Sequence, residues 1–294
     1  MKNRFNNLYI IVAAVLWGSI ALFYEALSDV GYSPGQVVLL RVGSAAVFMA
    51  VYIAARDPSL FRIRLRDIWM FIGTGVISLA FFNYCYFSAM DHLSHSVAAV
   101  LLYTAPIFVM LMSAIFFRER ITLTKIVSLV LTFVGCLLVT EVFLGAVTSP
   151  IGIVFGLGSG VGYALYTIFG TVATKRYRSE TISFYTFVLA TLCIVPMADI
   201  PSMAQTAVAF PFETVFYGTG IGLFVCLLPY LLYTKGLQHI QPGRASILAT
   251  LEPVVAAVIG IGVLHDPISV EKVIGMLLIL ISVVVLERFD KYSI

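Results

Sequence analysis

Apolar runs of roughly 20 residues alternate along the whole chain with short polar segments. A helix of about 20 apolar residues spans the ~30 Å hydrocarbon core of a bilayer. The runs are too long and too continuously apolar for the strands of a membrane barrel. The pattern therefore predicts an all-α integral membrane protein with ten transmembrane helices, at residues 7–27, 34–55, 68–90, 94–117, 121–143, 150–174, 181–198, 214–236, 243–264 and 268–287.

The composition agrees with this prediction and narrows the classes of partner. Of the 294 residues, 61% are apolar and only 11% are charged, whereas about a quarter of an average soluble domain is charged. The connections are short, the longest being expected at 199–213, so no soluble domain fits between the spans. The net charge of +3 forms no basic stripe, and we expect no nucleic-acid partner. The cysteines lie apart in apolar runs, so we expect no metal, no disulfide framework and no cofactor.

The basic residues predict an orientation. If the N-terminus is cytoplasmic, the cytoplasmic segments hold sixteen of the 18 Lys and Arg residues, and the outside segments hold only Lys272. The remaining one, Arg41, lies within the second span. Because Lys and Arg accumulate on the cytoplasmic side, we expect a multi-pass protein of the cytoplasmic membrane, in contact with the lipid bilayer, with both termini in the cytoplasm. Adding or removing one span would reverse every later loop and destroy this asymmetry.

The two halves of the chain are related. A shift of 147 residues, half the length, aligns spans 3–5 with spans 8–10 and matches Gly73 with Gly220, His92 with His239, Pro106 with Pro253 and Lys125 with Lys272. Each half holds five spans, an odd number, so the second half must be inverted. We expect two inverted five-helix repeats, 1–147 and 148–294, in one membrane domain. Secondary transporters use such repeats, with the substrate site near the midplane between the halves.

A family resemblance follows from short motifs in a fixed order. They are Leu16-Trp17-Gly18, Leu40-Arg41, Pro106 followed by Phe117-Arg118-Glu119, and Leu251-Glu252-Pro253-Val254. The chain resembles the EamA-type, ten-helix members of the drug/metabolite transporter superfamily over essentially its whole length. It departs from them at His265-Asp266, where the family usually has Gly-Glu. The resemblance implies a central cavity lined by the first four helices of each half, peripheral fifth helices, and transport of metabolites such as amino acids, often as export.

Two ionisable residues are predicted inside the membrane, where a charge needs a partner or a wet cavity. Arg41 either faces the cavity, binding an anionic group or a gating partner, or reaches outward to Glu25 or Asp29. Glu252 either binds a cationic group or carries a coupling proton, or else it caps backbone groups freed by Pro253 or pairs structurally with Arg41. At 1.5 Å per residue, Arg41 lies about 10 Å and Glu252 about 18 Å below the outer surface. The two residues are therefore expected to form a charge pair, or to bind the two ends of one zwitterion.

Polar and aromatic residues at similar depth complete the predicted site, because an apolar pocket with a few polar groups suits a small organic solute. Each tyrosine alone is more readily explained by packing than by binding, whereas the cluster as a whole favours a binding site. The predicted substrate-binding residues are Trp17, Arg41, Asn83, Tyr86, Tyr103, Tyr163, Tyr230 and Glu252, with Glu252 also as the coupling residue. Pro106 and Pro253 each remove one helical hydrogen bond, and we expect kinks or hinges there.

Glycines recur at every second position of the sixth span, at Gly156, Gly158, Gly160 and Gly162. They form two overlapping GxxxG patterns. Neither a preceding strand nor a following Lys-Ser/Thr supports a phosphate loop. The pattern predicts close helix packing.

Three classes of function compete. The leading prediction is a secondary active transporter of a small organic metabolite, such as an amino acid or a similar zwitterion, working by alternating access with a proton or another ion as the candidate coupling partner. Export is the expected direction, and no nucleotide-binding motif makes ATP the direct driver. A passive facilitator or channel is the alternative, although nothing resembles a filter motif. An intramembrane enzyme is disfavoured, because no HExxH or GxSxG motif and no candidate catalytic residue is found.

Overall fold

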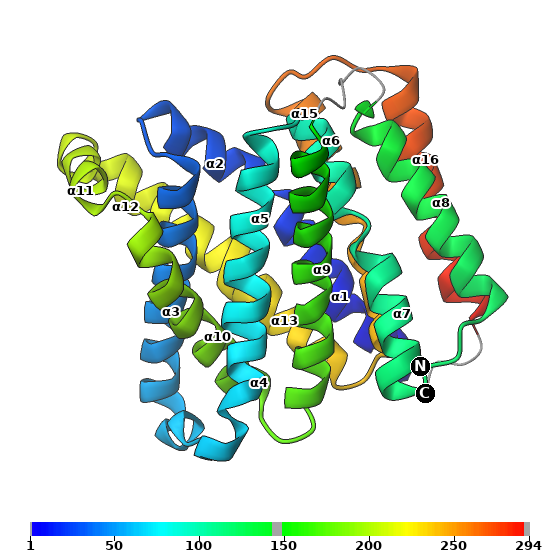
Figure 1. The fold of residues 1–294 in the computed structure, drawn as a ribbon, viewed down its shortest axis with the longest axis horizontal. Coiled ribbons are helices and arrows are strands. Elements are labelled where there is room, and N and C mark those ends of the chain that lie inside the picture. Colours follow the sequence, from blue (N-terminus) through cyan, green and yellow to red (C-terminus); the bar gives the residue numbers. More distant parts are fainter. Residues whose placement is uncertain (1, 143–148, 291–294) are drawn as a thin grey trace.

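The computed structural model describes residues 2–142 and 149–290, which form helices and contain no strand. Most helices run side by side along one common direction (Figure 1). Within the described ranges, eight helical stretches are long and apolar enough to cross a bilayer, and Leu123–Val139 is a shorter apolar helix. The prediction of an all-helical membrane protein is therefore confirmed at this level.

The first half begins with α1 (Lys2–Gly18) and α2 (Ile20–Asp29), which together form one stretch interrupted at Ser19. A capping box starts the next helix, because the Ser33 hydroxyl accepts from the Gln36 amide and the Gln36 side chain accepts from the Ser33 amide. The helices that follow are α3 (Pro34–Arg56), α4 (Ile68–Ile72), α5 (Phe81–Met90), α6 (His95–Leu102), α7 (Ala105–Phe117) and α8 (Leu123–Val139), with 3₁₀ turns at Pro58–Phe61 and Leu65–Asp67.

The second half has a closely matching order of elements. Its helices are α9 (Pro150–Ala173), α10 (Ser179–Ile194), α11 (Ile200–Ala209), α12 (Pro211–Gly220), α13 (Leu228–Leu237), α14 (Pro242–Ala249), α15 (Glu252–Gly262) and α16 (Val270–Phe289), with a 3₁₀ turn at Val195–Met197. The bounds of α14 are those of α6 shifted by 147 residues. The segment 199–213, expected as a loop, contains the helix α11. Asp199 starts this helix by accepting from the Ser202 amide.

Two spans are interrupted where prolines were expected to produce kinks. The chain leaves helical geometry between α6 and α7 and again between α14 and α15, and Pro106 and Pro253 occupy the second positions of α7 and α15. Proline is tolerated in a first helical turn because its missing N–H has no partner there. The prolines therefore begin new half-helices, and the predicted kinks are two-residue interruptions, at Tyr103–Thr104 and Thr250–Leu251.

Two π-helical segments, η3 (Gly73–Ala80) and η6 (Ile221–Leu227), lie between α4 and α5 and between α12 and α13. No hydropathy pattern predicted them. The π-helix is rare and is found frequently at functional sites. Each segment leads directly into a helix that lines the central cavity described below.

The predicted close packing of the glycine-rich helix α9 is confirmed. A Cβ atom at Gly162 would lie 3.0 Å from the backbone of Phe82 in α5, and one at Gly160 would lie 2.9 Å from the Leu101 carbonyl oxygen in α6. Only glycine lets these backbones approach so closely. Helix α9 is thereby held between α5 and α6 beside the cavity.

Helices α8 and α16 lie side by side at one edge of the molecule (Figure 1). The hydroxyls of Thr132 and Ser282 are hydrogen-bonded at 2.6 Å, and the Ser128 hydroxyl donates to the Ser282 carbonyl at 3.1 Å. Polar groups in a membrane need internal partners, and this seam supplies them. Apolar side chains on the perimeter, such as Ile115 at 72% exposure, face outward as a lipid-contacting surface requires.

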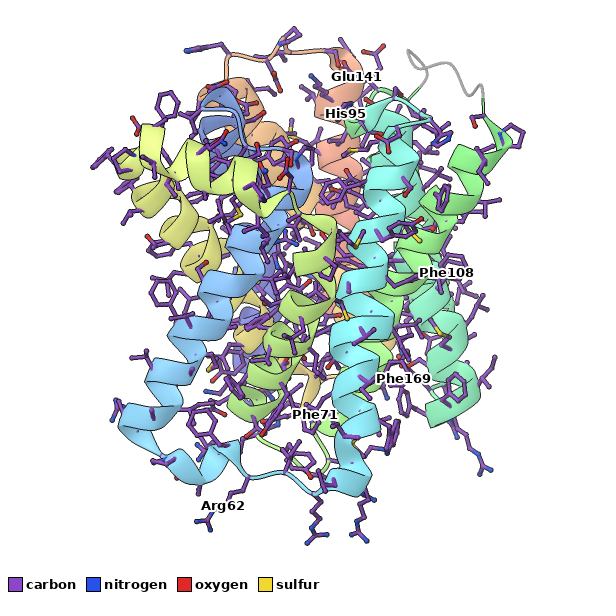
Figure 2. All side chains as sticks on the ribbon, turned by 60° about the vertical axis from the view of Figure 1, so that its left-hand side comes forward. Arg62, Phe71, His95, Phe108, Glu141 and Phe169 are labelled. Atoms are coloured by element: carbon purple, nitrogen blue, oxygen red, sulfur yellow. The ribbon has the colours of Figure 1, made fainter. Side chains whose placement is uncertain are left out.

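The two ends of the molecule differ in charge. Helix α1 begins and α16 ends at the same end of the molecule (Figure 1), and Figure 2 shows Arg62 at that end and His95 and Glu141 at the opposite one. We call the first the basic end. It also holds Lys175, whose ammonium lies over the Phe117 ring, and Lys235, whose ammonium lies over the Tyr9 ring. We call the other, which also holds Asp266, the acidic end.

Candidate functional site

A cavity of ≈ 310 Å³ occupies the centre of the bundle and extends toward the acidic end. The exposed His95 lines it, so it reaches the surface there. All eight predicted substrate-binding residues line this one cavity, and they come from six helices and one interhelical break: α1, α3, α5, α9, α13, α15 and the break before α7. Spacing in the sequence could not place them together, because they are separated by up to 235 residues.

Aromatic rings form the floor of the cavity. The Trp17 ring contacts the rings of Tyr163, Tyr230 and Tyr233, with centroids at 6.2, 5.2 and 5.3 Å. Tyr233 is fixed by a 2.8 Å hydrogen bond to the Thr167 hydroxyl. Offset and edge-to-face ring contacts add to the burial of apolar area. The floor is therefore a rigid aromatic surface against which an apolar group can rest.

Arg41 provides the positive charge of the cavity. The residue is 8% exposed, and its Nη2 atom donates to Asn83 Oδ1 at 3.4 Å. Its Nε atom has no hydrogen-bond partner within residues 2–142 and 149–290. Asn83 in turn donates from Nδ2 to the Leu79 carbonyl at 2.7 Å, which fixes its amide. A guanidinium has five donors, so Arg41 retains capacity for an anionic group.

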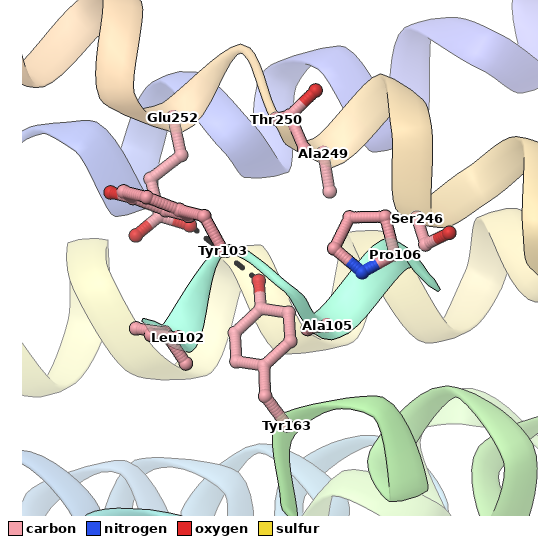
Figure 3. A pocket seen from close by; sticks show the side chains of 9 residues that line it. All are labelled: Leu102, Tyr103, Ala105, Pro106, Tyr163, Ser246, Ala249, Thr250 and Glu252. Carbon is pink, nitrogen blue, oxygen red and sulfur yellow. Dashed lines mark hydrogen bonds between the residues drawn. The ribbon is translucent and has the colours of Figure 1, made fainter. Parts of the chain in front are cut away.

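Glu252 provides the negative charge. It is the first residue of the half-helix α15, and the Tyr163 hydroxyl donates to its Oε2 atom at 3.5 Å (Figure 3). The N–H groups of a first helical turn favour a carboxylate. Figure 3 also shows Tyr103 beside this carboxylate, and a space of ≈ 20 Å³ between the two helix interruptions, lined by Pro106 and Thr250 among others, lies next to it. That volume suffices for about one water molecule.

Arg41 and Glu252 do not form the direct charge pair that was one of the expected arrangements. Within residues 2–142 and 149–290, no ion pair joins them, and each has a neutral partner instead. The outward reach of Arg41 to Glu25 or Asp29 is not observed either. The two ionisable groups are thus held by different helices on one cavity that the aromatic rings also line.

Glycine allows α1 to meet α15 at this point. A Cβ atom at Gly18 would lie 2.7 Å from the Glu252 carbonyl oxygen and 2.6 Å from Val255 Cβ. Any larger residue would push the two helices apart and shift the Glu252 backbone. Gly18 therefore positions the carboxylate relative to the Trp17 ring that precedes it in the chain.

Several lining residues escaped the sequence analysis. They are mostly apolar or lie toward the acidic end: Ile20, Tyr24, Val38, Phe82, Phe87, Met90 and His95. Tyr24 lies seven residues after Trp17 and Phe82 four residues before Tyr86, so helical periodicity from the predicted residues could have found both. His95 carried no such signal, because it begins a helix after a loop.

The basic end of the bundle is closed by a polar cluster. The Lys125 ammonium is 1% exposed and donates to Glu119 Oε1 at 2.8 Å and to Gln241 Oε1 at 2.8 Å. Glu119 Oε2 accepts from the Gly243 amide at 3.1 Å. Arg244 pairs with Glu287 at 3.3 Å. The bonds of Lys125 to Gln241 and of Glu119 to Gly243 join the two halves of the chain at the basic end. The lining of the cavity includes no residue of this cluster.

Comparisons with known proteins agree on one family. The model of the EamA-like transporter family matches residues 4–141 and again residues 150–288. Two proteins of Archaeoglobus fulgidus named as uncharacterized transporters are similar: one is 27% identical over 87% of this chain and 89% of that protein, and the other is 26% identical over 97% of both.

More distant relatives extend the comparison. The uncharacterized transporter YwfM of Bacillus subtilis is 22% identical over 98% of this chain and 95% of that protein. A crystal structure with a TM-score of 0.76 and 18% identity covers 95% of both chains. This structural likeness concerns the fold alone.

Proposed function

This chain belongs to the EamA-like transporter family, and from that premise we propose that it is a secondary active transporter of a small zwitterion, with an amino acid as the substrate class. The observation that carries the proposal is the placement of Arg41 and Glu252 on one cavity of ≈ 310 Å³, each without a charged partner among the residues that the structure describes. An isolated charge within a membrane is costly unless it is satisfied. A zwitterion satisfies both at once.

Each part of the substrate has a complementary group. The guanidinium of Arg41 binds the carboxylate, because its planar donors match that group. Glu252 binds the ammonium, assisted by the hydroxyl of Tyr103. The aromatic floor around Trp17 and Tyr230 contacts the side chain, and the apolar lining near Phe87 and Met90 leaves room for a hydrophobic one.

We further propose two inverted five-helix repeats, 1–147 and 148–294, and ten spans that include α8 and α16. The family model matches each half once, and the bounds of α6 and α14 differ by 147 residues at both ends. Inverted repeats support alternating access around a fixed central site. In this structure the cavity reaches the acidic end and the polar cluster closes the basic end, which fits one of the two states. With both termini cytoplasmic, this state is open to the outside.

Reconstitution tests the transport proposal. Purified protein in proteoliposomes should accumulate labelled amino acids above their external concentration when a proton gradient is imposed, and protein-free vesicles should not. Equilibration without accumulation would identify a passive facilitator, and chemical change of the solute would identify an enzyme. A panel of cationic, anionic and zwitterionic solutes then tests the class, because only zwitterions should compete with the labelled substrate.

A further inference from the structure

The loops that end α7 and α15 have the same architecture at opposite ends of the molecule. Arg118 and His265 both adopt left-handed backbone geometry, with φ of 56° and 61°. The following amides, of Glu119 and Asp266, donate back to the carbonyls of Ser113 and Gly260, at 3.3 and 2.9 Å. In the sequence each pair is separated by 147 residues, so one structural device occurs twice.

The lysine that follows each loop makes the same contacts at both ends of the molecule. The Lys125 ammonium donates to the Arg120 carbonyl at 3.2 Å, and the Lys272 ammonium donates to the Pro267 carbonyl at 3.1 Å. Their backbone amides are held by the N-cap hydroxyls of Thr122 and Ser269, respectively. The two ammonium groups are therefore presented in the same way at the two ends.

Only one of the two devices is engaged. At the basic end, Glu119 and Lys125 bind the start of α14 through the Gly243 amide and the Gln241 side chain. At the acidic end, the described residues include no hydrogen bond or ion pair from Asp266 or Lys272 to the equivalent start of α6. Asp266 is exposed there, and Lys272 pairs with Glu141 at 3.2 Å.

We propose that these are two alternating latches, and this inference rests on the proposed alternating access. When the cavity opens to the basic end, the Glu119–Lys125 latch releases α14. Asp266 and Lys272 then bind the start of α6, where the Ser96 amide and the Ser94 hydroxyl occupy the positions of Gly243 and Gln241. Each latch joins one half of the chain to the other, so each stabilises one closed end.

The two latches differ in strength. Glu119 also accepts a 2.6 Å hydrogen bond from the Ser113 hydroxyl, whereas the equivalent residue of the other loop, Gly260, has no side chain. Glu119 is one methylene longer than Asp266, and Gln241 reaches further than Ser94. The basic-end latch thus has more and longer contacts. The protein without substrate is expected to rest with the basic end closed, as it is in this structure.

A cross-linking experiment tests this inference with two cysteines placed beside the acidic-end latch and its proposed partners. Cysteines replace the exposed His95 and His265, which flank the acidic-end partners, in a full-length variant whose four native cysteines are replaced by alanine. A short bis-maleimide should link few molecules of this variant. Adding Glu119→Gln should raise the linked fraction several-fold, because it shifts the population toward the state with the acidic end closed. Adding Asp266→Asn to that variant should lower the fraction again.

The control is Glu25→Gln, which removes an exposed acid at the acidic end and should change nothing. Unchanged linking after both Glu119→Gln and Lys125→Met would overturn the proposal, as would complete linking in the starting variant. If amino acids are not transported but the cross-linking response is as expected, the proposed substrate class is wrong and the latch proposal stands. Normal transport with no cross-linking response would refute the latches alone.

A second, independent observation concerns a hollow of ≈ 570 Å³ at the basic end. It is lined by Arg62, Ile63, Arg64, Arg66, Asp67, Arg176 and Tyr177. The carboxylate of Asp67 is already occupied, because it pairs with Arg176 and accepts from the Tyr177 hydroxyl. Among the residues that the structure describes, the guanidinium groups of Arg62, Arg64 and Arg66 form no hydrogen bond or ion pair. The hollow therefore holds three surplus positive charges.

Apolar residues next to this hollow face outward. Leu65 is 81% exposed and Trp69 is 47% exposed. Both lie at the start of the candidate span Leu65–Met90, directly after Arg62 and Arg64 in the chain. Tryptophan is enriched where a membrane meets water. Basic hollows of this kind at the cytoplasmic side bind anionic lipid headgroups. We infer that Arg62, Arg64 and Arg66 bind a phosphate group, that of an anionic phospholipid whose chains lie along Leu65 and Trp69.

Binding to lipid and to free phosphate can be compared directly. Nanodiscs or mixed micelles that contain phosphatidylglycerol should stabilise the purified protein against thermal unfolding. Those that contain only phosphatidylcholine should not. Replacing the three arginines by glutamine should weaken this response by roughly tenfold or more, given the attraction of each basic residue to an anionic surface. The matched control replaces Arg118, Lys175 and Lys235, basic residues of the same end outside the hollow.

The outcomes separate the sources. Stabilisation by inorganic phosphate as strong as that by the lipid supports a phosphate site and assigns it to a soluble anion. Equal loss in the control triple variant would overturn the assignment to this hollow, since the response would then follow total charge. No response to either phosphate source would overturn the site itself.

Discussion

The Nη2 atom of Arg41 donates to the Oδ1 atom of Asn83 at 3.4 Å, across the space between α3 and α5. This contact aims the guanidinium at the cavity and leaves its Nε atom without a hydrogen-bond partner in the described part of the chain. A charge-assisted hydrogen bond contributes about 1.5–3 kcal/mol. If Arg41 binds the substrate carboxylate, its loss should therefore be visible chiefly as weaker binding.

The first prediction is that Arg41→Lys lowers transport at low substrate concentration by roughly tenfold or more, because a lysine lacks the two-donor geometry for a carboxylate. Initial uptake into proteoliposomes measures this, and the elution profile of the purified protein monitors folding. Asn83→Leu should cause a smaller loss, since it removes only the group that orients Arg41. If Arg41→Lys transports at the wild-type rate, carboxylate binding by Arg41 is wrong.

The positions of eight apolar spans and the close packing of α9 could be predicted from the sequence, because length, hydropathy and glycine spacing act locally. The helix α11 was missed because the apolar run there is too short to span a membrane and contains prolines at both ends. The π-helical segments were missed because their altered hydrogen bonding leaves no mark in hydropathy.

Depth and polarity were sufficient to name residues of the cavity from the sequence. They were not sufficient to identify the hydrogen-bond partners of these residues. The Arg41–Asn83 and Tyr163–Glu252 contacts depend on how helices rotate about their axes, and a single sequence does not fix that rotation. The expected charge pair failed for this reason: a similar depth in two helices does not make their side chains face each other.

The second prediction concerns the packing of α9. Gly160→Ala should destabilise the protein by about 1–3 kcal/mol, because its Cβ would meet the Leu101 carbonyl and the Thr104 hydroxyl. The matched control is Gly262→Ala, where an added Cβ meets nothing within 4 Å. Thermal unfolding in one detergent measures both. Equal melting temperatures for the two variants would contradict the proposed role of Gly160.

The third prediction is that the basic end is cytoplasmic. Cysteines introduced at the exposed positions Ser59 and Asp91 lie at the basic and the acidic end, respectively. A membrane-impermeant maleimide added to intact cells should label Asp91→Cys and leave Ser59→Cys unlabelled until the membrane is permeabilised. The reverse labelling pattern would invert the proposed topology and reverse the side to which the cavity opens.

The fourth prediction concerns acid stability at the acidic end. A hydrogen bond from Ser269 and the nearby charge of Lys272 hold the pKa of Glu141 below its usual range. A carboxyl whose pKa is lowered by folding stabilises the protein above its unfolded pKa of about 4.3, and this contribution is lost as the pH falls through the folded value. Glu141→Gln should therefore be less stable than wild type near neutral pH, and the gap should close in acid. A gap that stays constant with pH would contradict this account.

The fifth prediction concerns Glu252, which should be required for gradient-driven transport and dispensable for folding. The residue starts α15, faces Tyr103 and accepts from Tyr163. The corresponding start of α7 is Ala105, so a half-helix of this shape forms without an acid at that position. Glu252→Gln keeps the size and the hydrogen-bonding capacity of the side chain and removes its charge and its proton exchange.

Proteoliposomes separate the two tasks proposed for Glu252. If it carries the coupling proton, Glu252→Gln should abolish accumulation driven by a proton gradient while exchange of labelled for unlabelled substrate continues. If it also binds the ammonium group, exchange should require a higher substrate concentration as well. Glu25→Gln serves as the control, because that acid is exposed and lies outside the cavity. Accumulation by Glu252→Gln at the wild-type rate across the pH range would remove Glu252 from both roles, because a side chain with neither a charge nor an exchangeable acidic proton can perform neither.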